Sequence, residues 1–299
     1  VVVNGKTKAT AKLNIIVNAI TGFCPIMSWS GFRITEQKLA PDIMQIAKPN
    51  DLVIRDLGYF ALPAFKQMIE CGIYFLSRWE NCVNLYDPVT IRRINLKSLL
   101  KGKSYVDTVL LCGQEETVTV RFVAIKLPVA VANERRRKAR EHRYQKVNHN
   151  KLYYYLLGYS IYITNVEKEI WTCHQIAEAY ATRWQVEILF KSWKSGFGIN
   201  KLIPPDTRND HRIESVLYLI VLYLTWFQIK VYEKVKVHCL KKELDISILR
   251  IAKWAVVNIN NWLIEELSLQ DKHKIIYYCS YDKRRRLNAG KRFSNVFDP

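Results

Sequence analysis

The stretch 180–194 (YATRWQVEILFKSWK) constrains the chain most, because as a helix it has two different faces. An α-helix turns about 100° per residue, so four polar positions fall within about a quarter of its circumference. These positions are Tyr180, Arg183, Glu187 and Lys194. A neighbouring face collects side chains typical of a core: Val186, Leu189, Phe190, Trp193 and Phe197. Two interpretations fit the polar face: a solvated surface with an Arg/Glu pair at i, i+4, or a carboxylate that holds a metal ion between cations that hold phosphate.

The overall charge bears on the choice between these interpretations. The chain has 299 residues, with 46 Lys and Arg against 27 Asp and Glu, and its formal net charge is +19. Such an excess of positive charge favours nucleic acid or another polyanion as the partner. A hydrophobic content of 49% with 12% aromatic residues excludes a disordered protein and allows one large domain or two smaller ones.

Cysteine usage and hydropathy indicate the compartment. The 7 cysteines form no CxxC pair and are odd in number, which excludes the usual zinc spacings and a secreted disulfide framework. No signal peptide opens the sequence, and the missing initiating Met predicts that it starts inside a longer protein. The most apolar run, 216–229, is too short to span a bilayer and predicts a buried core helix. We expect a cytoplasmic protein without a membrane segment.

The first third of the chain predicts an α/β arrangement. Residues 11–30 are typical of two strands joined by a Thr-Gly turn, and residues 35–48 of a helix. A short β-prone run at 52–54 is followed by Asp56, and a helical pattern returns at 61–71. This places Asp56 at the carboxyl end of a strand, where ligands commonly bind in α/β sheets.

The remainder of the chain divides into a β-prone block, 74–164, and a helical part. The helical segments are 173–195, 211–236 and 245–267. Within the β-prone block, ERRRKAREHRYQK (134–146) is strongly basic, and a further basic cluster lies at 283–292. A run of charges is usually a solvated surface, and contact with phosphate is the second interpretation. The first of these basic residues are Arg135, Arg136, Arg137 and Lys138.

Two motifs together resemble one protein family. The helix carries the pattern Y-x2-R-x3-E-x6-K, and Asp56 lies in IRDLGYF. Both are similar to motifs of bacterial insertion-sequence transposases of the DDE type, in the group named after insertion sequence four. The β-prone block and the basic run before LLGYSIYITN resemble further features of that family, so the resemblance covers nearly the whole chain. It implies an α/β fold: a ribonuclease H-like catalytic core (1–73 and 166–299), interrupted by a β-rich insertion (74–165), with helical C-terminal elements and a basic tail.

The resemblance also implies a chemistry and a set of roles. Cutting and joining DNA strands are phosphoryl transfers that two Mg²⁺ ions can assist, and Mn²⁺ can replace Mg²⁺. Asp56 and Glu187 would be metal ligands. Residues expected to bind DNA are Tyr180, Arg183, Lys194, Lys191, Tyr159 as a stacking partner of a flipped base, Arg135, Arg136, Arg137 and Lys138. The implied partners are double-stranded DNA, as transposon ends and target, and a second copy of the chain, in the bacterial cytoplasm at the nucleoid.

The first catalytic Asp of the family has no clear counterpart. Asn4 follows a β-prone run, but it lies too close to the hairpin at 11–30 for the family layout. We expect this Asp upstream of Val1, together with any N-terminal DNA-binding domain, so that the 299 residues alone bind DNA without cutting it. Two alternatives remain open: a truncated, inactive DNA-binding remnant, and a ribonuclease H-like nuclease that cuts without strand transfer.

Overall fold

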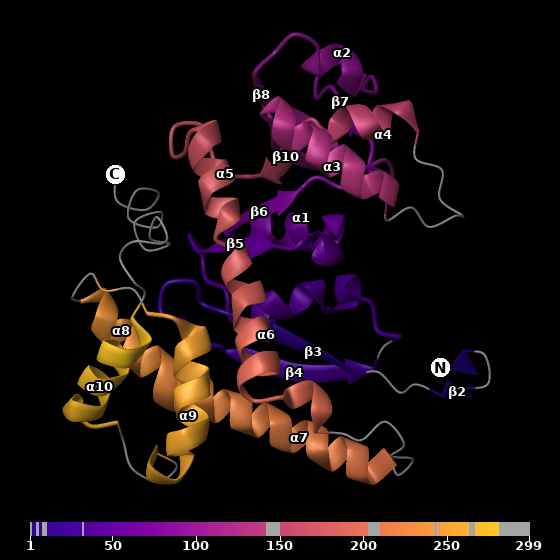
Figure 1. The fold of residues 1–299 in the computed structure, drawn as a ribbon. Coiled ribbons are helices and arrows are strands. Elements are labelled where there is room, and N and C mark those ends of the chain that lie inside the picture. The colour runs from indigo at the N-terminus through magenta and orange to yellow at the C-terminus, as the bar shows by residue number, and fades with distance from the viewer. Residues whose placement is uncertain are drawn as a thin grey trace. The chain divides into compact units, whose positions relative to one another are not determined.

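The computed structural model describes residues 2–3, 6–7, 11–31, 33–141, 150–202, 210–241, 244, 246–262 and 267–280 (Figure 1). The chain divides into two compact units. Unit one contains residues 1–34 and 182–299, and unit two contains residues 35–181. Each unit is described by itself below. The boundary between Ala181 and Thr182 falls inside the Y-x2-R-x3-E-x6-K pattern.

Unit two is built on a six-stranded mixed sheet. The strands lie in the order β5 (Leu52–Arg55), β6 (Tyr74–Arg78), β10 (Tyr159–Thr164), β9 (Val118–Lys126), β8 (Tyr105–Cys112) and β7 (Leu85–Tyr86). Only β5 and β6 are parallel, and the other neighbours are antiparallel. All residues of β10 are buried, which its central place in the sheet explains. The predicted boundary between residues 73 and 74 thus lies between two paired strands, and the predicted domain limits stay predictions.

Short helices surround this sheet. They are η1 (Glu36–Gln45), η2 (Leu57–Tyr59), α1 (Leu62–Glu70), α2 (Leu96–Leu100), α3 (Val129–Glu141), α4 (Lys151–Leu156) and α5 (Cys173–Ala181). Helix α1 packs on the sheet through Phe65, whose ring stacks on Phe75 of β6 with centroids 4.4 Å apart. The segment predicted as a helix at 35–48 is a 3₁₀ helix with Pro41 inside it. Because Pro41 has no backbone N–H to donate, it does not suit an α-helix interior.

Unit one combines a hairpin with a helical bundle. Its strands are β1 (Val2–Val3), β2 (Lys6–Thr7), β3 (Ala11–Ile16) and β4 (Ile26–Gly31). The expected hairpin is confirmed, since β3 pairs antiparallel with β4. Gly22 in its turn has φ 78°, a conformation that favours glycine. Its helices include α6 (Trp184–Gly196), η3 (Ile199–Lys201), α9 (Ile248–Trp262) and α10 (Leu269–Cys279).

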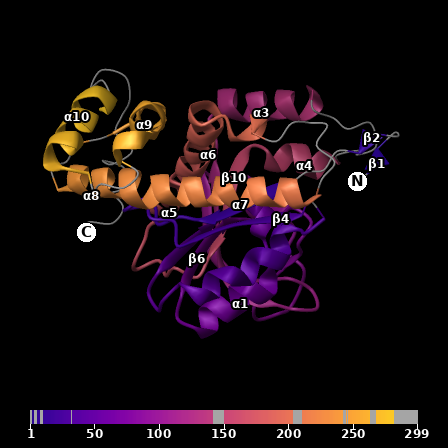
Figure 2. The same cartoon turned by 90° about the horizontal axis from the view of Figure 1, so that it is seen from below.

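A long helical segment, His211–Leu240, runs through unit one. It comprises most of α7 (Asp210–Trp226), the π-helical η4 (Phe227–Glu233) and α8 (Lys234–Leu240), and Figure 2 shows it as one rod. Helix α9 contacts η4, and α10 contacts α8. The helix predicted over 211–236 is confirmed, whereas the prediction that its apolar run, 216–229, is buried in a core is only partly right. Exposed side chains on it include Tyr218, Leu219 and Leu222. Its length and apolar composition would suffice to cross a membrane, but core helices of water-soluble proteins meet the same criteria, so this single helix does not indicate membrane insertion.

Candidate active site

Asp56 stands directly after β5, as the sequence predicts. The residue is exposed and begins the 3₁₀ turn η2, in which the backbone N–H of Tyr59 donates to the Asp56 carbonyl at 3.0 Å. Its carboxylate does not cap this turn. An exposed carboxylate at the carboxyl end of a strand, on a hydrogen-bonded turn, is suited to bind a hard cation.

Arg55 fixes the backbone beside Asp56. The Arg55 side chain is 6% exposed and donates from Nη2 to the carbonyl oxygen of Ala40 in η1. Burial lowers the pKa of this guanidinium to about 10, while Tyr59 and Asp42 favour its charged form. The arginine therefore stays charged at neutral pH and ties η1 to the end of β5. A Cβ at Gly58 would lie 2.5 Å from a carboxylate oxygen of Glu36, so η1 also approaches η2 closely.

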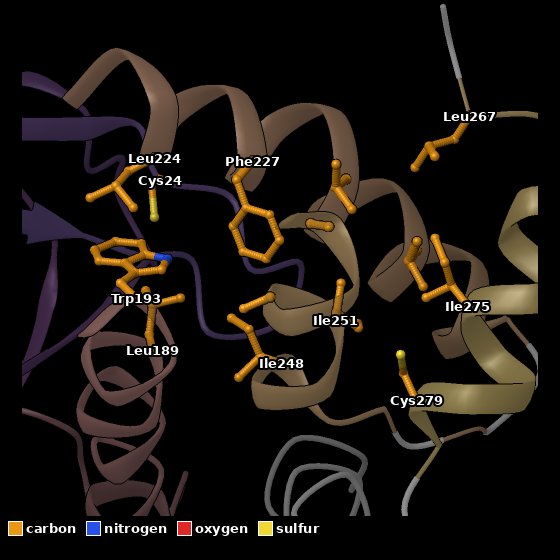
Figure 3. Close-up of a cluster of buried hydrophobic side chains, with 14 of the residues drawn as sticks. Cys24, Leu189, Trp193, Leu224, Phe227, Ile248, Ile251, Leu267, Ile275 and Cys279 are labelled. Atoms are coloured by element: carbon orange, nitrogen blue, oxygen red, sulfur yellow. The ribbon is translucent and has the colours of Figure 1, made fainter. Parts of the chain in front are cut away.

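Helix α6 holds Glu187 through its apolar face. Leu189 and Trp193 are buried in the core cluster of unit one, together with Leu224, Phe227 and Cys24 (Figure 3). The last residue of α6, Gly196, faces α9, where an added Cβ would lie 2.9 Å from the Cβ of Ala252. The close crossing and the buried tryptophan fix the rotation of α6. Lys191 and Lys194, for which the sequence predicts contact with DNA, are exposed.

Arg183 and Glu187 form an ion pair at the start of α6. Nη2 of Arg183 lies 2.6 Å from Oε1 of Glu187, and the two side chains are 23% and 41% exposed. This geometry agrees both with a solvated surface pair at i, i+4 and with a carboxylate that holds a metal ion. A metal ion would meet a Glu187 carboxylate that is already near a cation, and Arg183 would then be placed for a phosphate.

The single helix predicted over 173–195 is wrong. Helix α5 ends at Ala181 and α6 begins at Trp184, and the N–H groups of Gln185 and Val186 bond three residues back, to Thr182 and Arg183. Tyr180 is on α5, 8% exposed, with its ring 5.2 Å from that of Tyr162. In this arrangement Tyr180 packs α5 on β10, and the same placement gives no support to its expected contact with DNA.

The basic run at 134–146 divides into inward and outward arginines. Residues 142–146 lie outside the described residues, as does the basic cluster at 283–292. Arg135 donates to the carbonyl oxygen of Tyr159 at 3.2 Å and to Oγ of Ser160 at 3.3 Å, and burial lowers its pKa. Arg136 donates to the carbonyl oxygen of Tyr154 at 3.0 Å. Both arginines therefore hold α3 to β10 and α4.

The outward residues are Arg137, Lys138 and Arg140. Arg137 is 56% exposed and pairs with Glu134 and Glu141, so its charge is largely balanced on its own helix. Lys138 is 61% exposed, with Nζ 3.6 Å from Oε1 of Glu134. Arg140, which was not among the predicted DNA ligands, lies over the ring of Tyr154 at 5.8 Å. A surface contact with phosphate fits Lys138 better than it fits Arg135 or Arg136.

Tyr159 is placed differently from its predicted role. Its side chain is 6% exposed on β10, and its hydroxyl donates to the carbonyl oxygen of Leu100 at 3.1 Å. Burial raises the pKa of Tyr159 to about 12. The ring is therefore not on the surface, and this geometry does not support stacking on a flipped base.

Sequence reasoning missed Trp184. This residue opens α6 beside Arg183 and is 58% exposed, which is unusual for a tryptophan. Its position in the helical pattern, one residue after Arg183 and off the apolar face, was the available signal. Exposed aromatic rings beside cations are typical of surfaces on which bases stack.

Asp56 and Glu187 each carry a carboxylate, the type of ligand that a hard divalent cation prefers. The described residues contain no group of three or more His, Cys, Asp or Glu side chains suited to a metal. Asp56 belongs to unit two and Glu187 to unit one. Mg²⁺ usually takes one or two carboxylates from a protein and keeps several waters, so two carboxylates fit its chemistry. Asn4 lies outside the described residues.

Comparison with known proteins decides the family. The sequence model of a family described as transposase DDE domain matches residues 4–225, which include Asp56 and Glu187. This chain belongs to the DDE transposase family. Domains of this family typically use divalent metal ions. The expected resemblance is confirmed, although the match stops short of the C-terminal helices.

Individual transposases agree with the family match. The transposase of insertion sequence IS231D from Bacillus thuringiensis subsp. finitimus is 30% identical over 220 residues, which are 66% of this chain and 45% of that protein. The transposase of IS231F from Bacillus thuringiensis subsp. israelensis is 29% identical over 211 residues, or 63% and 44%. The transposase of IS1151 from Clostridium perfringens is 29% identical over 179 residues, or 51% and 36%. The matched part of the chain thus spans about half the length of these relatives, or less.

Proposed function

We propose that this chain is the catalytic part of a DNA transposase that binds transposon-end DNA and carries out metal-dependent strand cleavage and strand transfer. The observation that carries the proposal is the pair of acidic residues within the family match: Asp56, exposed at the end of β5, and Glu187, held on α6 beside Arg183. In this proposal β5, β6 and the β3–β4 hairpin belong to a ribonuclease H-like core, and β8 to β10 are an insertion that extends its sheet.

Asp56 and Glu187 would hold Mg²⁺, with Mn²⁺ as a substitute. When bound, such ions would lower the activation free energy of phosphoryl transfer by stabilising charge on the attacking and leaving oxygens. The chain's own residues then have two tasks. Arg183, Lys191 and Lys194 grip phosphates along α6, since a guanidinium or ammonium binds them by charge-assisted hydrogen bonds. Trp184 stacks on a base near the cleavage site.

The partners follow from the reaction. Transposition brings two transposon ends together, so we propose that the protein acts as a homodimer on double-stranded DNA in the bacterial cytoplasm. The exposed lysines of α6 and the formal net charge of +19 support a DNA partner.

Glu187→Gln tests the assignment of the metal ligand. In the protein expressed from its complete coding sequence, we expect this change to abolish Mg²⁺-dependent cleavage of end DNA while duplex affinity stays within about twofold, because Gln keeps the shape and loses the charge that binds the ion. The loss of rate should be on the order of a thousandfold or more. Glu178→Gln, at an exposed glutamate of α5, is the control and should cleave normally. Cleavage by Glu187→Gln within a few-fold of wild type would remove Glu187 from the site.

A further inference from the structure

A short loop of unit two carries an unusual combination of side chains. Tyr86 and Arg93 form an antiparallel bridge, and the loop Asp87–Arg92 lies between them. At its tip Val89 is 86% exposed and Ile91 is 60% exposed. Isolated exposed hydrophobic residues need no explanation, but two on one six-residue loop form an apolar tip.

The backbone at Ile91 is strained. Its φ is 55°, the left-handed region that β-branched residues rarely adopt. In the part of the chain that the structure describes, the other residues with positive φ are glycines and Asn50. Hairpin loops of this kind usually place Gly at the left-handed position. Ile91 is therefore an exposed isoleucine on a strained backbone. Strain of this kind occurs preferentially at functional sites.

Hydrogen bonds hold the loop in one shape. Oδ1 of Asp87 accepts from the N–H of Val89 at 3.1 Å, and from the N–H and hydroxyl of Thr90 at 2.7 and 2.9 Å. The N–H of Asp87 donates to the carbonyl oxygen of Arg92 at 2.9 Å, and that of Ile91 to the carbonyl oxygen of Asp87 at 3.0 Å. The apolar tip is thus ordered before any partner binds, which reduces the entropy lost on binding.

The surroundings of the tip are basic. Arg92 and Arg93 are exposed, and α2, which follows, carries the exposed Lys97. Between residues 88 and 103 the sequence has five Lys or Arg and no Asp or Glu. The acid that begins the loop, Asp87, has its carboxylate bonded to the loop itself. An apolar tip with exposed cations beside it is complementary to duplex DNA, whose phosphates surround an apolar stack of bases.

We propose that the loop Asp87–Arg92 is a DNA wedge: Val89 and Ile91 insert against the base stack of a duplex, while Arg92 and Arg93 hold the flanking phosphates. The proposal rests on the proposed function in one respect, that the chain binds duplex DNA. It adds a contact outside the metal-binding carboxylates and the Y-x2-R-x3-E-x6-K pattern. Wedges of this kind unstack a base step and bend the duplex.

The test uses the 299-residue chain and a random-sequence duplex of about 30 base pairs, which is long enough to be bent. It measures the affinity for the duplex, the bending of the duplex and the dependence of the affinity on salt. The duplex carries a donor and an acceptor dye at its ends. Val89→Ser/Ile91→Ser should weaken binding about fivefold or more and remove the energy-transfer change, because the apolar contact is lost. Its slope of log affinity against log salt should stay unchanged. Arg92→Gln/Arg93→Gln should instead lower that slope by about 1.8, since each phosphate contact contributes about 0.9.

Two further variants separate a DNA role from a folding role. Ile91→Gly relieves the positive φ, so its melting temperature should stay equal or rise while its DNA affinity and bending fall. Val257→Ser, at an 80% exposed valine of α9, is the matched control and should behave as wild type.

The outcomes are distinct. If wild type binds and bends the duplex, and the Ser double variant and Ile91→Gly do so equally well, the wedge is wrong while the proposed function stands. If the loop variants change only the oligomeric state in light scattering, the tip is a protein interface and the proposal is also wrong. If wild type fails to bind any duplex, the proposed function fails and the wedge with it.

Discussion

The ion pair between Glu187 and Arg183 occupies both side chains when neither metal ion nor DNA is bound. The Glu187 carboxylate lies 2.6 Å from Arg183 in a pair that is partly exposed on both sides. Pairs with this exposure contribute little to stability, about 0–1 kcal/mol, because water screens them. The pair can therefore open at low cost when a metal ion and a phosphate arrive together. Arg183 would move from carboxylate to phosphate, and Glu187 from cation to metal ion.

Arg183→Gln should separate these two roles. Without the Arg183 cation, the Glu187 carboxylate no longer exchanges an ion pair for the metal ion, so Mn²⁺ should bind more tightly. If the ion pair contributes about 1 kcal/mol, the gain in Mn²⁺ affinity is up to about fivefold. Duplex affinity should fall in the same variant because a phosphate contact is lost. Free Mn²⁺ measured by electron paramagnetic resonance gives the first quantity. Arg137→Gln, at an exposed pair on α3, is the control. Weaker Mn²⁺ binding in Arg183→Gln would mean that the arginine orients Glu187 instead of competing for it.

At the scale of elements, Arg121 on β9 anchors the connection from β10 to α5. Its guanidinium bonds both carboxylate oxygens of Asp107, at 2.9 and 2.8 Å, and the carbonyl oxygens of Val166 and Glu167, at 3.0 and 2.9 Å. Arg121 is 5% exposed and Asp107 14%. A capping box of Thr172 and Gln175 then starts α5. The ion pair thus fixes the segment that leads to Tyr180.

Arg121→Met should destabilise unit two by about 3–5 kcal/mol, because it leaves a largely buried carboxylate and two carbonyl groups without their donor. Arg137→Met removes the exposed ion pairs with Glu134 and Glu141 and should cost no more than about 1 kcal/mol. Urea unfolding of the two variants side by side makes the comparison. Replacing Asp107 by Leu in the Arg121→Met background should recover part of the loss. Equal stabilities of the two single variants would contradict the anchoring role.

How far the sequence predicts these elements depends on which forces set them. The local sequence pattern was enough to predict the β3–β4 turn at Gly22 and the position of Asp56 after β5. Turns and strand ends depend mainly on residues that are close in sequence. The break between α5 and α6 has no Gly or Pro at Thr182–Arg183 that could have marked it in the sequence. The inward direction of Arg135 and Arg136 could not be predicted from the local sequence pattern either. A run of charges shows composition, whereas the partners of Arg135 come from a strand more than twenty residues away.

At the scale of the whole molecule, the two candidate metal ligands come from different units of one chain. Asp56 is on the sheet of unit two, and Glu187 on the helical bundle of unit one. The sequence separates them by a β-prone block and a basic helix, and only the reaction requires them to meet. Hard divalent ions bind weakly to a single carboxylate and better to two. We therefore propose, as the central claim, that Asp56 and Glu187 bind the same divalent ions.

Iron-mediated backbone cleavage tests this claim most directly. Fe²⁺ replaces Mg²⁺ in the 299-residue chain, and ascorbate with peroxide generates short-lived radicals that cut the backbone close to the bound ion. The account predicts two cuts, one near Asp56 and one near Glu187, both suppressed by excess Mg²⁺. Both should disappear in Asp56→Asn and persist in Asp51→Asn, its exposed neighbour. A cut at only one of the two segments, or two cuts that survive in Asp56→Asn, would contradict a shared site.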